Sequence, residues 1–119
     1  MNKGRKISGG KYHSNRKKRA HEKQRDERKT SLGERKTKFL RIRSGAKRAI
    51  LLKTNFANIV NNGKSQKAEI ENVLETPQNK FLARQNRLMK GAIIKTSLGK
   101  AKITNRPSRE GQINAILID

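Results

Sequence analysis

The sequence predicts an all-β fold, a small antiparallel β-barrel or sandwich, with a disordered basic extension at its N-terminus. Apolar residues make up 31% of the 119 residues, well below the roughly 45–50% of an average globular domain. Only five of them lie in residues 1–38, against 32 in residues 39–119. From residue 39 onward they recur with a period of two between turn signals. We therefore divide the chain into an extension, residues 1–38, and a β-barrel-like domain, residues 39–119.

The expected strands follow one another at roughly even spacing, which is typical of a sandwich or barrel. They cover residues 39–43, 50–52, 56–60, the run around 68–74, 81–83, 92–96, 100–104 and 112–118. Asn62-Gly63 predicts a tight hairpin turn, because Asn and Gly tolerate the positive φ of a type I′ turn. No segment after residue 39 shows a sustained helical period.

Two expectations concern side-chain direction in these strands. In the run after the hairpin turn, Ala68, Ile70 and Leu74 are expected to point one way, and Lys67, Glu69 and Glu71 the other. Phenylalanine is the main aromatic residue, at positions 39, 56 and 81. Because all three fall in strand patterns, we expect them in the core, which argues against a surface on which single-stranded bases stack.

Charge and composition exclude several classes of protein. The 31 Lys and Arg against 9 Asp and Glu give a net charge of +22, which calls for a polyanionic partner. Membrane binding by a helix needs an apolar face, which the extension lacks, so nucleic acid is favoured over a membrane. There is no cysteine, which excludes a disulfide framework and fits a reducing compartment. No stretch is apolar enough to span a membrane, and residues 1–19 lack the apolar region of a secretory signal.

The extension carries 15 of the 31 basic residues and four acids. Gly9-Gly10 favours mobility, and four cations in a row occupy residues 16–19. We expect this segment to become ordered against RNA. His13 and His21 lack the cysteines or acidic pair of a zinc site, and we interpret them as neighbours of phosphates or bases. The expected RNA-binding residues of the extension are Arg5, Lys6, Lys11, Arg16, Lys17, Lys18, Arg19, Lys23, Arg25, Arg28 and Lys29.

A second group of cations lies in the folded part, beside turns or glycines, where loops commonly carry function. These residues are expected to form a second RNA-contacting surface. They are Arg41, Arg43, Lys47, Arg48, Lys90, Arg106 and Arg109.

The motifs of common catalytic sites are missing from the sequence. It has no glycine-rich phosphate loop, nucleophile elbow or metal-spaced ligand set. Glu69 and Glu71 share a strand face and could in principle hold Mg²⁺ for a nuclease, but a solvated outer face paired with Lys67 is favoured. We expect no enzymatic activity, no cofactor, no metal and no small-molecule substrate.

Several blocks of the sequence resemble, in order, a known family. They are residues 4–10, 16–19, 41–45, 55–59, 85–94, 104–107 and 111–117. The set, and especially Lys90-Gly91-Ala92-Ile93-Ile94 with Arg106-Pro107, resembles the archaeal and eukaryotic small-subunit ribosomal protein family designated "eight-e", in its short archaeal-type form. At residues 20–24 the sequence departs from the Tyr-Glu-Leu-Gly-like stretch usual in that family.

The resemblance implies a β-barrel-like domain, a basic extension threaded into ribosomal RNA, and no catalytic activity. It implies small-subunit rRNA and neighbouring ribosomal proteins as partners, and the cytoplasmic ribosome as the location. Two other hypotheses stay open at this point: a chromatin-like protein or nucleic-acid chaperone acting off the ribosome, and the Mg²⁺ nuclease that would use Glu69 and Glu71.

Overall fold

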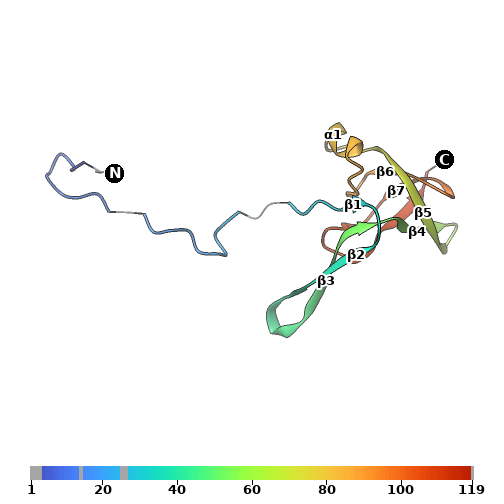
Figure 1. Cartoon of the computed structure of the whole chain (residues 1–119), viewed down its shortest axis with the longest axis horizontal. Helices are drawn as coiled ribbons and strands as arrows, with labels where there is room; N and C mark the ends of the chain where they lie inside the picture. The colour runs from blue at the N-terminus through green and yellow to red at the C-terminus, as the bar shows by residue number, and fades with distance from the viewer. Residues whose placement is uncertain (1–3, 14, 25–26, 119) are drawn as a thin grey trace.

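A closed β-barrel is the centre of the molecule (Figure 1). The computed structural model describes residues 4–13, 15–24 and 27–118. The barrel strands, in spatial order, are β4 (Phe56–Asn61), β5 (Lys64–Glu75), β6 (Ile93–Thr96), β7 (Gly99–Ile103) and β8 (Asn114–Leu117). Neighbouring strands are antiparallel except β8 and β4, which close the barrel in parallel. The prediction of an all-β barrel is confirmed.

The turn between β4 and β5 forms where the sequence predicts it. Asn61 pairs with Lys64, and the two residues between them have positive φ, 46° at Asn62 and 79° at Gly63. This backbone matches the twist of the flanking strands. The expected hairpin of β6 and β7 is also present, with Thr96 paired to Gly99.

A three-stranded sheet precedes the barrel in the chain. Its strands are β1 (Ser31–Leu32), β2 (Lys36–Arg41) and β3 (Lys47–Thr54), in the order β1-β3-β2, and a 3₁₀ turn, η1 (Arg43–Gly45), joins β2 to β3. The β2–β3 hairpin, the segment from residue 36 to residue 54, projects away from the barrel (Figure 1). Residues 31–38 were expected to belong to the extension, but residues 31–32 and 36–38 pair within this sheet, and residues 33–35 connect the two strands.

The transition from extension to folded chain lies at Thr30. Its side chain is 1% exposed, and its Oγ1 donates a hydrogen bond of 3.0 Å to the Leu51 carbonyl oxygen. Every described residue before it is exposed. The described part of the extension therefore contributes nothing to the core, as its composition predicts.

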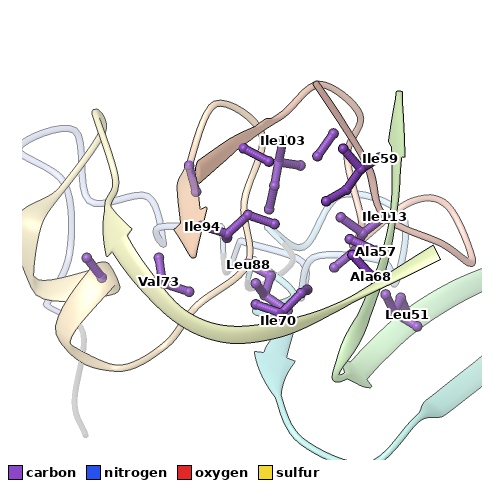
Figure 2. Close-up of a cluster of buried hydrophobic side chains, with 14 residues drawn as sticks. Leu51, Ala57, Ile59, Ala68, Ile70, Val73, Leu88, Ile94, Ile103 and Ile113 are labelled. Carbon is purple, nitrogen blue, oxygen red and sulfur yellow. The ribbon is translucent and has the colours of Figure 1, made fainter. Parts of the chain in front are cut away.

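The core fills the barrel interior and extends to β3 (Figure 2). Its largest buried side chains include Ile59, Ile94, Ile103 and Ile113, together with Leu88 from the segment before β6. Alanines alternate with them and fit the narrow barrel. These alanines are Ala57, Ala68, Ala92, Ala101 and Ala115.

The side-chain direction expected for β5 is only partly correct. Ala68 and Ile70 are buried, but Leu74 is 43% exposed, whereas Val73 is buried. The pairing of β5 with β6 shifts between Ile70 and Asn72 and again between Val73 and Glu75. A bulge of this kind inserts a residue into one strand and reverses the alternation beyond it.

The strand expected at residues 81–83 is a helix, α1 (Lys80–Arg84). The Asn79 side chain accepts a hydrogen bond of 2.9 Å from the Phe81 amide, which is a favourable N-cap. Periodicity cannot distinguish helix from strand in a run of three apolar residues. No helix in the described ranges is long and apolar enough to cross a membrane.

The expectation that the phenylalanines belong to the core is wrong. Phe39 is 66% exposed, Phe81 64% and Phe56 38%. Phe39 lies on the projecting β2–β3 hairpin. The other two rings have cationic neighbours, the Lys67 ammonium 4.2 Å from the Phe56 ring centroid and the Arg84 guanidinium 5.6 Å from that of Phe81. Because these rings are exposed, their place in strand patterns no longer excludes a surface on which bases stack.

Candidate nucleic-acid interface

A groove of about 820 Å³ lies between the β2–β3 hairpin and the loop of residues 104–111. We call it the basic groove, because six cations line it: Arg28, Arg41, Arg48, Lys90, Arg106 and Arg109. Among its lining residues in the described chain, Glu27 is the one acid. Apolar side chains, including Leu40, Ile50 and Leu88, complete the surface. A concave surface with this excess of positive charge attracts polyanions.

The loop of residues 104–111 is shaped by one asparagine side chain. The Asn105 Nδ2 donates to the Glu110 Oε2 and to the Gln112 carbonyl oxygen, each at 2.8 Å. Its Oδ1 accepts from the Asn114 amide at 3.0 Å. Within the loop, the Arg106 carbonyl oxygen accepts the Arg109 amide at 2.9 Å. Both guanidinium-bearing residues therefore project from a well-defined turn.

The same loop is fastened to the β2–β3 hairpin. Pro107 is buried, and its carbonyl oxygen accepts a hydrogen bond of 3.2 Å from the Leu51 amide of β3. This bond joins two segments more than 50 residues apart in the chain. The two walls of the basic groove are thus held at a fixed separation.

Lys90 extends from a third segment, a turn that leads into β6. The Lys90 carbonyl oxygen accepts the Gln78 Nε2 at 2.8 Å, and the next amide, of Gly91, donates to the Ile103 carbonyl oxygen at 2.8 Å. Gly91 has a φ of +82°, which only glycine adopts without strain. The turn directs Lys90 toward the groove.

The remaining predicted cations of the folded part lie at the tip of the β2–β3 hairpin. Arg41 pairs with Lys47 across the two strands, and the Ile42 amide donates to the Ala46 carbonyl oxygen at 2.8 Å. Arg43 begins the 3₁₀ turn between them. Five of the seven predicted cations therefore line the basic groove, whereas Arg43 and Lys47 form the adjacent tip.

The extension enters the fold beside the groove. The Thr30 carbonyl oxygen accepts a hydrogen bond of 2.9 Å from the Leu88 amide, and the Leu32 amide donates one of 3.1 Å to the Asn86 carbonyl oxygen. Just before this anchor, Arg28 lines the groove. Arg28, which was predicted only as a cation of the extension, thus also lines the basic groove, a connection that no local sequence pattern indicates.

Near its start, the extension contains a small turn. The Lys6 amide donates to the Gly10 carbonyl oxygen at 2.9 Å, and Arg5 forms an isolated antiparallel bridge with Lys11. The Lys6 ammonium lies 5.7 Å from the ring centroid of Tyr12. Three predicted RNA-binding cations are brought together here.

A second turn follows the run of cations at residues 16–19. The Glu22 carboxylate accepts a hydrogen bond of 2.8 Å from the Arg16 guanidinium and one of 2.9 Å from the Arg19 amide. The Arg16 hydrogen bond, followed by that of Arg19, lowers the pKa of Glu22, and Glu22 in turn raises the pKa of Arg16. Lys17, Lys18, Lys23 and Lys29 are exposed, and Arg25 lies outside the described residues.

The acids considered for a nuclease lie on a solvated face. The Glu71 Oε2 pairs with the Lys95 Nζ at 2.8 Å. Lys67, the partner considered from the sequence, lies over the Phe56 ring instead. Within the described ranges, no three His, Cys, Asp or Glu residues gather as a metal site would require. Ion pairing therefore accounts for Glu71.

Comparison with known proteins identifies similar sequences along almost the whole chain. Residues 1–118 match the family model described as Ribosomal protein S8e. The small ribosomal subunit protein eS8 of Haloarcula marismortui is 40% identical over 115 residues, which cover 97% of this chain and 94% of that protein. The eS8 proteins of Halorubrum lacusprofundi and Methanosarcina barkeri are 41% and 42% identical, with the same coverage.

Proposed function

Because the chain belongs to the ribosomal protein S8e family, we propose that it is a structural constituent of the small ribosomal subunit, which binds folded rRNA through its basic extension and its basic groove. The family consists of structural components of the ribosome rather than enzymes. The partners are then small-subunit rRNA and neighbouring ribosomal proteins, and the site of action is the cytoplasmic ribosome. No cofactor or small-molecule substrate takes part.

The observation that carries the proposal is the continuity of the two basic surfaces. The extension is exposed along its described length and is anchored at Thr30, next to a groove with six cations and one acid. A single RNA backbone can therefore follow the extension into the groove. Phosphate contacts of this kind set the position and orientation of a protein on RNA without reading its bases.

The two surfaces have different mechanical properties and so different roles. The groove cations are held by the Leu51–Pro107 hydrogen bond and the Asn105 side chain, so their spacing is preset and selects RNA of matching shape. The described residues of the extension are all exposed, so this segment can adapt to the path of the RNA. We propose that the extension before Thr30 supplies most of the electrostatic affinity and that the folded part supplies placement.

Salt titration tests this division. Each phosphate neutralised releases counterions and contributes about −0.7 to −0.9 to the slope of log affinity against log salt. If about eight extension cations engage phosphates, the full chain should lose roughly 6 to 7 units of slope when residues 1–29 are deleted. The quadruple alanine variant of residues 16–19 should lose about 3.

The measurement is binding of the three proteins to small-subunit rRNA, with thermal melts showing that the shortened chain is folded. A slope unchanged by the deletion would show that the folded surface alone carries the electrostatics. Sedimentation separates the ribosomal role from a chaperone acting elsewhere. Stoichiometric recovery with salt-washed small subunits supports the ribosomal role, and its absence there contradicts it.

A further inference from the structure

Phe39 presents an aromatic ring to solvent on the projecting β2–β3 hairpin. Its exposed fraction is 66%, and it lies in β2, four residues before Arg43, where the hairpin's 3₁₀ turn begins. A single exposed apolar residue is ordinary on a protein surface. What distinguishes Phe39 is the set of residues around it.

The strand register defines the surroundings of the ring. Phe39 is paired with Ala49, and the next pair on the same face is Arg41 with Lys47, because side chains two residues apart share a face. Ala49 is small, and beyond it lies Gly111, where a β-carbon would stand only 3.0 Å from the Ala49 Cβ. The loop therefore packs closely on Ala49, while the Phe39 ring stays 66% exposed, and two cations lie next along the hairpin.

The charge of the hairpin indicates the class of partner. Residues 36–48 contain six basic residues and no acid. An acidic protein surface would satisfy the charge, and an aromatic anchor in such an interface fills an apolar pocket of the partner. Proteins that bind unpaired nucleotides combine these two features, cations along the backbone and an aromatic ring on which a base stacks.

We propose that Phe39 is a stacking platform for one unpaired base of the bound RNA, and that Arg41 and Lys47 bind the phosphates flanking that base. The proposal rests on the proposed function and adds to it, because phosphate contacts alone do not require an unpaired nucleotide. Stacking is tolerant of sequence, since every base has a π face. The site would therefore recognise an unpaired position rather than a particular base.

Two RNA probes of equal length and charge test the proposal on the full chain. One is a hairpin whose loop contains unpaired adenines, one of them replaced by fluorescent 2-aminopurine, and the other is a blunt duplex. We expect Phe39→Ala and Phe39→Leu to weaken binding of the looped probe by about 5- to 150-fold, the range of base–aromatic stacking. Phe39→Trp should bind the looped probe as the unmodified protein does and quench the 2-aminopurine fluorescence. In all three variants, the affinity for the duplex and the slope of log affinity against log salt should not change.

Phe81→Leu is the matched control, because Phe81 is 64% exposed but lies on α1, outside the hairpin. It should leave binding of both probes unchanged. Unchanged affinity of Phe39→Leu for the looped probe, with steep salt dependence retained, would overturn the stacking role and leave the proposed function intact. Equal losses of affinity for both probes would show that Phe39 maintains the geometry of the hairpin, and would also overturn the stacking role. A Phe39 variant that binds RNA normally but does not enter small subunits would assign Phe39 to a protein contact, with the same consequence. Salt-independent binding by the unmodified protein would instead contradict the proposed function.

Discussion

Neutralising the basic groove should weaken the salt dependence of RNA binding by a predictable amount. The variant replaces Arg48, Lys90, Arg106 and Arg109 by alanine, four groove cations whose side chains are all exposed. Exposed substitutions of this kind usually change the free energy of unfolding by no more than about 0.5 kcal/mol each. If each cation neutralises one duplex phosphate, the slope should fall by about 3.6. When the salt concentration rises from 50 to 200 mM, the affinity of the unmodified protein should then fall by a factor roughly 150 times larger than the affinity of the variant.

A control variant separates contact from net charge. The control replaces four exposed lysines that do not line the groove by alanine, and so removes the same number of charges. These lysines are Lys64, Lys80, Lys100 and Lys102. Both proteins are titrated against small-subunit rRNA by filter binding or anisotropy, after thermal melts show that they are folded. Distant charges are largely screened at 0.15 M salt, so the control should lose less than about one unit of slope. Equal losses in the two variants would show that total charge, and not the groove, sets the affinity.

Three further predictions concern the fold and the extension. Trypsin should digest the extension and leave a resistant fragment that begins near Thr30, because every described residue before it is exposed; a resistant fragment that retains residues 10–24 would contradict this. Thr76 is 2% exposed, and its hydroxyl has no hydrogen-bond partner in the described part of the chain. Thr76→Val should therefore maintain the free energy of unfolding or raise it by about 1 kcal/mol, and urea titration showing a loss greater than that would disprove the reasoning. The pKa of Glu22 is lowered by its Arg16 partner. The ion pair therefore stabilises the turn at pH values above the ordinary pKa of Glu22, and this stabilisation is lost as the pH falls through the lowered pKa. Amide NMR shifts at residues 19–23 should report that loss, and Glu22→Gln should abolish the pH dependence.

The barrel could be predicted from sequence because its strands obey local rules. Alternation marks β4 and β8, and Asn62-Gly63 specifies the β4–β5 turn. The bulge in β5 was not predictable in the same way, because one extra residue leaves the apolar composition unchanged and only reverses the faces. This is why Leu74 is exposed and Val73 buried. The helix α1 was missed because its N-cap, Asn79, precedes too short an apolar run to show a period.

The candidate interface was predictable residue by residue but not as a surface. The position of Arg106 and Lys90 beside turns and glycines is visible in the sequence. Their convergence with Arg48 depends on the Leu51–Pro107 hydrogen bond, which joins distant segments. The same limitation applies to Phe39, whose strand pattern predicts a core position, although β2 belongs to a hairpin outside the barrel.

The central claim is that the extension and the basic groove contact small-subunit rRNA together, and crosslinking on intact subunits tests it most directly. Ultraviolet crosslinking followed by mass spectrometry assigns each crosslinked peptide to a position in the chain and in the rRNA. The account predicts crosslinked peptides from residues 4–29 and also from the groove segments around Arg48, Lys90 and Arg106. Crosslinks confined to the segments around the control residues Lys64 and Lys100, with none from the extension or the groove, would contradict it.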